Sequence, residues 1–195
     1  MAIIPRGMAD QIIDKIKTAL ETFEAEQVLI DPNVFFNVVR DMIRPPSDSD
    51  LPLVNIWAES LDPQREGSSA RLCQQELVRI NIDCYTKGLS MSDVGIDDGV
   101  AMARLYYLAE QVKYGLYRLI NADFGMSAGV IAKKPWPRWS IFQSEIKLPE
   151  TEVVAGRWVI ELTYQWTPED IAGDILDEIG VDTGKWAATY HYGGD

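Results

Sequence analysis

The sequence predicts an α+β fold: a mixed, mainly antiparallel sheet of about four to five strands with helices packed on one face. Three observations predict it. A long amphipathic helix is expected from Asp97 to Asn121, two strand-like segments precede it, and two follow it. At a rise of 1.5 Å per residue the helix is about 36 Å long, enough to cross a whole sheet. The simplest arrangement lays this helix across one face of the sheet.

The length and composition predict one domain with an appended arm. Residues 1–166 are expected to form the α+β domain and residues 167–195 an acidic helix followed by an aromatic tail. The hydrophobic content of 47% supports a packed core, and the net charge is −12. Nucleic-acid binding without sequence preference needs clustered Lys and Arg, and an anionic membrane repels such a chain. Residues 1–10 lack the apolar segment of a signal peptide, and no segment has the length of a membrane span, so no membrane partner is expected.

The first half of the chain begins with an amphipathic helix expected over residues 10–24. Residues 34–43 fit neither the helical nor the strand period, so strand and helix both remain open there. Residues 51–60 are the next expected strand, and residues 61–70 a polar connection. Residues 74–87 form the clearest strand. Its apolar residues alternate with polar ones, which predicts one buried face and one that is wet or shared with a partner; the apolar set is Val78, Ile80, Ile82 and Cys84.

The second half of the chain begins with the long helix, whose apolar residues recur at steps of three and four. They are Val100, Leu105, Leu108, Val112, Leu116 and Leu119. Residues 132–139 are expected to be irregular because Pro135 and Pro137 interrupt them. Residues 140–148 are expected to be a strand, 149–156 a connection, and 157–166 a final strand. That strand places Trp158, Ile160, Leu162, Tyr164 and Trp166 on one face.

Catalytic and metal-binding motifs were sought among the reactive side chains. The only histidine is His191, near the end of the sequence, and a terminal histidine is more often a solvated group than a catalytic base. Cys73 and Cys84 are the only thiols and stand an odd number of positions apart along one strand, so a disulfide or a shared metal is improbable. No glycine-rich phosphate loop is present. We therefore expect neither an enzyme nor a cofactor nor a metal site.

A short basic and aromatic segment is the candidate docking site for a partner. It comprises Lys133, Lys134, Trp136, Arg138 and Trp139. Basic residues with tryptophans in a proline-stiffened loop stand out in so acidic a chain. The alternative is an ordinary connection whose tryptophans turn back into the core.

Two further segments are candidate subunit interfaces. On the long helix, Tyr107, Tyr114 and Tyr117 lie off the apolar face, where they pack against the N-terminal helix or meet another subunit. In the arm, a narrow apolar stripe is followed by aromatic residues; the candidates there are Ile171, Ile175, Ile179, Trp186 and Tyr190. The arm either folds back on its own sheet or lies on a neighbour, and we favour exchange of arms around a ring.

Four segments, in their order and spacing, carry a resemblance to a known family. They are LPLVNIW at 51–57, QQELVRINI at 74–82, the helix at 100–119 and GRWVIELTYQW at 156–166. In these features the sequence resembles the tail terminator (tail completion) proteins of long-tailed phages, in particular the lambda-like type. The resemblance covers most of residues 9–166. Residues 123–139 and the tail from Thr167 are additions to the pattern.

The resemblance implies a non-enzymatic structural protein of the virion. Such proteins form a hexameric ring on the last ring of the tail tube protein, stop its polymerisation and offer a surface to the head connector. The expected location is the head–tail junction of the virion, and the host cytoplasm during assembly. DNA passes through such a ring without specific binding, which agrees with the acidic charge. Another neck, connector or tube component is the alternative within this class. A small-molecule-binding or enzymatic α+β domain, which needs a pocket of convergent polar groups, is the alternative from another class.

Overall fold

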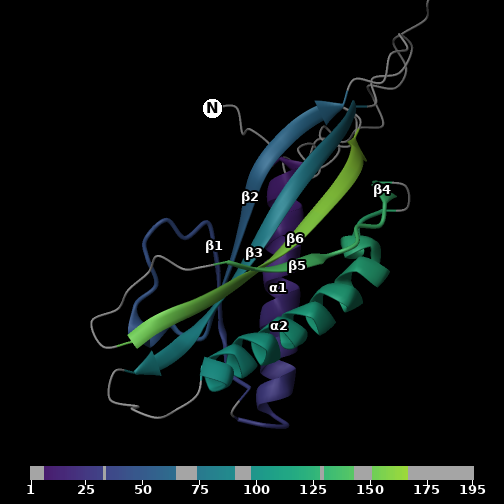
Figure 1. Ribbon diagram of the computed structural model, residues 1–195. Coiled ribbons are helices and arrows are strands. Elements are labelled where there is room, and N and C mark those ends of the chain that lie inside the picture. The colour runs from purple at the N-terminus through teal and green to yellow at the C-terminus, as the bar shows by residue number, and fades with distance from the viewer. Residues whose placement is uncertain are drawn as a thin grey trace, which may run out of the picture.

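The computed structural model describes residues 7–32, 34–64, 74–90, 98–127, 130–142 and 151–166 (Figure 1). Its helices are α1 (Met8–Val28) and α2 (Asp98–Asn121). Its strands are β1 (Asn37–Arg40), β2 (Leu53–Gln64), β3 (Gln74–Ser90), β4 (Ile131–Lys133), β5 (Arg138–Phe142) and β6 (Thr151–Trp166). The expected C-terminal arm lies outside the described residues.

The strands form one six-stranded sheet in the order β1-β2-β3-β6, and both β4 and β5 pair with the outer edge of β6. β1 runs parallel to β2, and every other pairing is antiparallel. The predicted α+β class with a mixed, mainly antiparallel sheet is confirmed. The sheet has more strands than the four to five expected, because β1, β4 and β5 are short segments added at its two edges.

One face of the sheet is apolar and lies against both helices, as the alternation in β3 and β6 predicts. In β3 and β6 the register places Ile80 opposite Ile160 and Ile82 opposite Trp158. These side chains join a single buried cluster with residues of both helices. The helical members of the cluster include Ile12, Ile16, Leu20, Leu105, Val112 and Leu116. Val100, expected on the buried side of α2, is instead 40% exposed, because at 3.6 residues per turn it lies on the same side as Arg104 and Tyr107 and away from the buried Ala101 and Leu105.

The two helices pack closely where Gly115 of α2 faces α1. A Cβ atom at Gly115 would stand 2.7 Å from Cδ2 of Leu20. The absence of a side chain therefore lets the backbones approach one another at the centre of the core.

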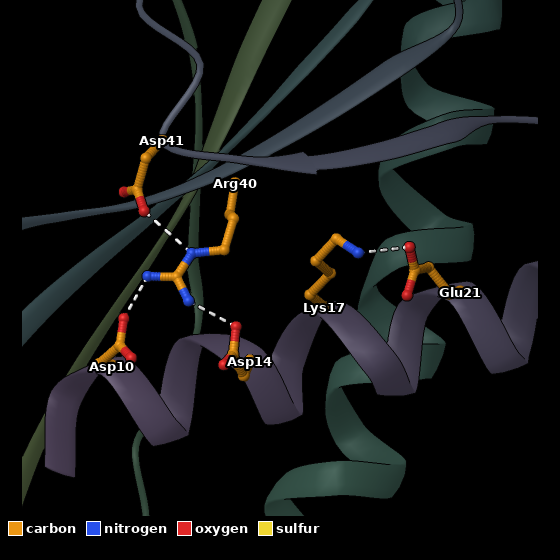
Figure 2. A network of polar contacts seen from close by, with 6 residues as sticks. All are labelled: Asp10, Asp14, Lys17, Glu21, Arg40 and Asp41. Atoms are coloured by element: carbon orange, nitrogen blue, oxygen red, sulfur yellow. Dashed lines mark hydrogen bonds and ion pairs between the residues drawn. The ribbon is translucent and has the colours of Figure 1, made fainter. Parts of the chain in front are cut away.

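A salt-bridge cluster fastens α1 to the edge of the sheet. Arg40, at the end of β1, binds Asp10 and Asp14 of α1 and the neighbouring Asp41 (Figure 2). Its Nη1 stands 2.5 Å from Oδ1 of Asp14. The hydrogen bond to Asp10 is the largest cause of a raised pKa for Arg40, against which burial acts. The short edge strand is thus joined to the helix by charge as well as by apolar contacts.

Several segment boundaries differ from the sequence-based expectations. β2 continues to Gln64, into the polar connection expected over residues 61–70, because it pairs with β3 there. Residues 132–139 are not wholly irregular: the prolines confine the irregular part to 134–137, and the flanks form β4 and β5 because each pairs with β6. Residues 151–156, expected in a connection, form the first part of β6, which pairs with β3 along its whole length. The ambiguous segment 34–43 contains the strand β1 at its centre.

Candidate functional site

The predicted docking residues in the segment from β4 to β5 differ in exposure: some face solvent and others pack against the core. Trp136 is 79% exposed, and its ring tilts against Tyr117 of α2 with centroids 6.3 Å apart. Trp139, in β5, packs on Trp158 with ring centroids 5.2 Å apart. Trp136 therefore points outward, as expected of a docking site, and Trp139 packs into the core, as expected of an ordinary connection. Each of the two interpretations describes part of this segment.

The basic residues of the same segment bind carboxylates of the chain itself. Nζ of Lys134 stands 3.1 Å from Oδ1 of Asp123, and Nη2 of Arg138 stands 2.9 Å from Oε2 of Glu161. Lys133 lies in β4. These ion pairs are exposed, so each adds little to stability but lowers the local positive charge. What the segment offers a partner is chiefly the ring of Trp136.

The tyrosines of α2 extend this exposed aromatic surface along the helix. Tyr107 is 52% exposed and Tyr114 is 60% exposed, and they stand two helical turns apart on the same side of α2. Tyr117 follows and contacts Trp136. We call Tyr107, Tyr114, Tyr117 and Trp136 the aromatic ridge. Such rings are enriched in protein–protein interfaces because they bury a large apolar area and lose little side-chain entropy.

The arm candidates Ile171, Ile175, Ile179, Trp186 and Tyr190 lie outside the described residues, as does His191. They remain predictions. The structure therefore brings together only the loop residues and the α2 tyrosines, through the contact between Tyr117 and Trp136.

The sheet face opposite the helices carries a polar cluster that the sequence did not single out. At its centre, Asp83 of β3 is only 2% exposed. Arg157 of β6 donates to it with Nε 2.5 Å from Oδ1 and Nη2 3.1 Å from Oδ2. Nε1 of Trp57 and the hydroxyl of Tyr85 also donate to Oδ2, at 2.9 Å and 3.3 Å. A buried carboxylate is acceptable here because four donor groups surround it.

Aromatic rings cover this cluster from both sides. The guanidinium of Arg157 lies 5.1 Å from the Trp57 ring centre and 5.0 Å from that of Phe142. Burial, and next the charge of Asp83, raise the pKa of Tyr85 to about 12. The hydrogen bonds to Asp83 raise the pKa of Arg157. The signal in the sequence was the presence of Trp57 and Tyr85 on polar strand faces, where aromatic residues indicate a covered rather than a wet surface.

A cavity of about 350 Å³ lies between α2 and the segments that flank β1. Phe36, Leu51 and Leu108 line it with apolar surface, and Arg104 and Tyr107 line it from α2. Thr86 lines it too, with a buried hydroxyl that has no hydrogen-bond partner in the described part of the chain. Tyr107 therefore belongs both to the aromatic ridge and to this cavity.

The described residues include one thiol, that of Cys84. Cys84 is fully buried, and burial raises the pKa of its thiol, so it is not an activated nucleophile. No three His, Cys, Asp or Glu side chains of the described segments gather closely enough to hold a metal ion. Within these segments neither helix has the apolar length that crossing a membrane requires. No protein-family model matches the chain, and no curated protein matches it.

Proposed function

We propose that this protein caps the tail tube of a long-tailed phage, ends its polymerisation and provides the surface that joins tail to head. The observation that carries the proposal is the arrangement of the segments that resemble tail terminator proteins. Residues 53–57, 74–82 and 156–166 lie in β2, β3 and β6, which are neighbours in the sheet, and α2 packs across them. The resemblance in sequence order is thus matched by one continuous structural unit.

The aromatic ridge supports a role in assembly. Tyr107 and Tyr114 are exposed two turns apart on α2, and Tyr117, half-buried against the core, contacts the exposed ring of Trp136. A protein that acts through its surfaces needs an exposed aromatic anchor of this kind for each partner. We assign the ridge to contacts with neighbouring subunits, the tube protein or the connector.

The charge supports the proposed passage of DNA. The net charge of −12 opposes adsorption of a polyphosphate, so a ring of such subunits does not retain the genome that slides through it. Lys134 and Arg138, on either side of Trp136, are paired with carboxylates, which weakens them as candidates for a phosphate contact.

The proposal is tested by comparing phage particles made with and without the gene, together with the mass of the purified protein in solution. We expect a hexamer by analytical ultracentrifugation, tails of abnormal length without the protein, and few tails joined to heads. Tails of normal length, joined normally in its absence, would contradict the proposal.

One observation favours the alternative of a small-molecule-binding domain. The cavity beside α2 combines apolar walls with the Thr86 hydroxyl, which has no partner among the described residues, as ligand sites do. This alternative predicts a stable monomer whose melting temperature rises when a ligand fills the cavity. A hexamer that loses assembly when the cavity rim is altered contradicts it.

A further inference from the structure

The cavity beside α2 has the features of a receptor for an apolar side chain. Phe36, Leu51 and Leu108 are each less than a tenth exposed and form apolar walls. Thr86, 3% exposed, leaves its hydroxyl without a partner in the described part of the chain, although a buried hydroxyl normally finds one. An occupant that fills the cavity with an apolar side chain and forms one hydrogen bond with the Thr86 hydroxyl would match both the apolar walls and this polar group.

The rim of the cavity is positively charged. Arg104 of α2 is exposed and forms no ion pair with any residue in the described segments. Lys87, also on the rim, binds Asp48 with Nζ 2.7 Å from Oδ2. In a chain of net charge −12, an arginine beside an apolar cavity that has no carboxylate partner among the described residues favours an acidic occupant with apolar side chains.

The C-terminal sequence has this composition. Between residues 167 and 195 there are seven acidic residues and a single lysine, Lys185. Isoleucines recur at steps of four, at Ile171, Ile175 and Ile179, among those acids. A segment that presents apolar side chains between carboxylates complements an apolar cavity beside Arg104.

The end of β6, after which this segment follows in the sequence, and the cavity lie at opposite ends of the sheet. β6 ends at Trp166, which pairs with Gln74 at the start of β3. Lys87, which lines the cavity, lies near the other end of β3. At about 3.3 Å per residue the two points are roughly 43 Å apart. When a second copy is placed head to tail, the end of its β6 comes close to the cavity of the first copy. The segment then does not have to run back along its own sheet.

We infer that the cavity formed by Phe36, Leu51, Thr86, Arg104 and Leu108 receives the acidic segment 167–195 of a second copy of this chain. Repeated head to tail, such a contact is heterologous, and it builds a ring when the rotation between successive copies closes. The inference rests on the ring in the proposed function and names the contact that builds it. It also gives Tyr107, on the rim, a place in the subunit interface.

Photo-crosslinking of the full chain tests the inference. Tyr107 is replaced by p-benzoylphenylalanine, and equal amounts of isotopically heavy and light protein are mixed before irradiation. We expect crosslinks from position 107 to peptides of 167–195, with heavy–light pairs present. The matched control places the same probe at Trp136, which is more exposed than Tyr107 but does not line the cavity, and it should give few crosslinks to that segment.

A charge reversal gives a second measurement that does not depend on the probe. Arg104→Glu should weaken assembly by about tenfold in sedimentation experiments, more at low salt than at high salt. Its control, Arg118→Glu, makes the same change on the same helix at an exposed ion pair with Glu26 and should have little effect on assembly.

The outcomes separate this inference from the proposed function. Crosslinks confined to pairs of the same isotope mean that the segment binds its own chain, and overturn the inference. A hexamer with no crosslinks to 167–195 overturns it as well and leaves the ring in place. A monomer at every concentration removes the ring and the inference together.

Discussion

Arg157 of β6 donates two hydrogen bonds to the carboxylate of Asp83 on β3, and that carboxylate is almost completely buried. The pair joins the two central strands across the face opposite the helices. Its partners Trp57 and Phe142 come from two other strands, so four strands meet at one ion pair. This cluster makes the clearest prediction for stability.

Replacing Arg157 should destabilise the fold. Arg157→Gln leaves Asp83 buried with its strongest donor removed, and we expect a loss of about 3 kcal/mol in the free energy of unfolding, measured by urea denaturation. Arg79→Gln is the control, because Arg79 binds Glu161 at an exposed position of the same face, and it should cost less than about 1 kcal/mol. Equal losses of unfolding free energy in the two variants would show that the buried pair of Arg157 and Asp83 stabilises the fold no more than an exposed ion pair does.

Stability should fall in alkaline solution partly through Tyr85. Its pKa in the folded protein is raised from 10.0 to about 12, so the unfolded chain releases this proton first as the pH rises. The contribution is complete below pH 10 and is lost as the pH rises toward 12. Urea denaturation between these pH values should show a shallower decline for Tyr85→Phe than for the natural protein. Parallel declines would remove Tyr85 as a cause.

Gly156 should not tolerate a side chain. A Cβ atom there would stand 2.4 Å from ring carbons of Trp139, so Gly156→Ala should cost about 1–3 kcal/mol through overpacking. The double variant Gly156→Ala with Trp139→Phe should recover part of that loss. As a control, Gly7→Ala meets nothing within 4 Å and should change the melting temperature little. An unchanged stability of Gly156→Ala would mean that β5, with Trp139, shifts at little cost to make room for the methyl group.

The two tryptophans of the β4–β5 segment should separate stability from assembly. Trp139→Ala should lower the free energy of unfolding by about 2–3 kcal/mol, because its ring packs on Trp158. Trp136→Ala should leave stability nearly unchanged and reduce joining of tails to heads by about tenfold, measured by complementation. Adding Arg138→Ala to Trp136→Ala should likewise preserve the fold. Normal joining by Trp136→Ala would exclude this loop from the docking surface.

The sequence predicts the helices and the buried strand faces well, for a local reason. Each of β3 and β6 has one face on the helices, so the alternation around Ile80 and Ile160 is sufficient to assign it. The same pattern does not contain the register, which decides that Ile82 lies opposite Trp158. Register depends on contacts between distant segments, and no single segment reveals them.

The polar cluster and the edge strands could not be predicted from the sequence, because they too depend on contacts between distant segments. Asp83 stands in an alternating pattern with Arg79 and Asn81, and it is buried only because Trp57 and Phe142 arrive from other strands. β4 and β5 flank two prolines, and their strand conformation comes from pairing with β6 rather than from local preference. Of the predicted docking residues, only the structure distinguishes Trp136 from Trp139.

The division of the outer edge of β6 between β4 and β5 has a consequence for self-association. A long bare edge strand templates the addition of another strand and so invites open-ended aggregation. Here two short strands cover that edge, and residues 134–137 interrupt it. Addition of a further strand along β6 is therefore opposed on this side of the molecule.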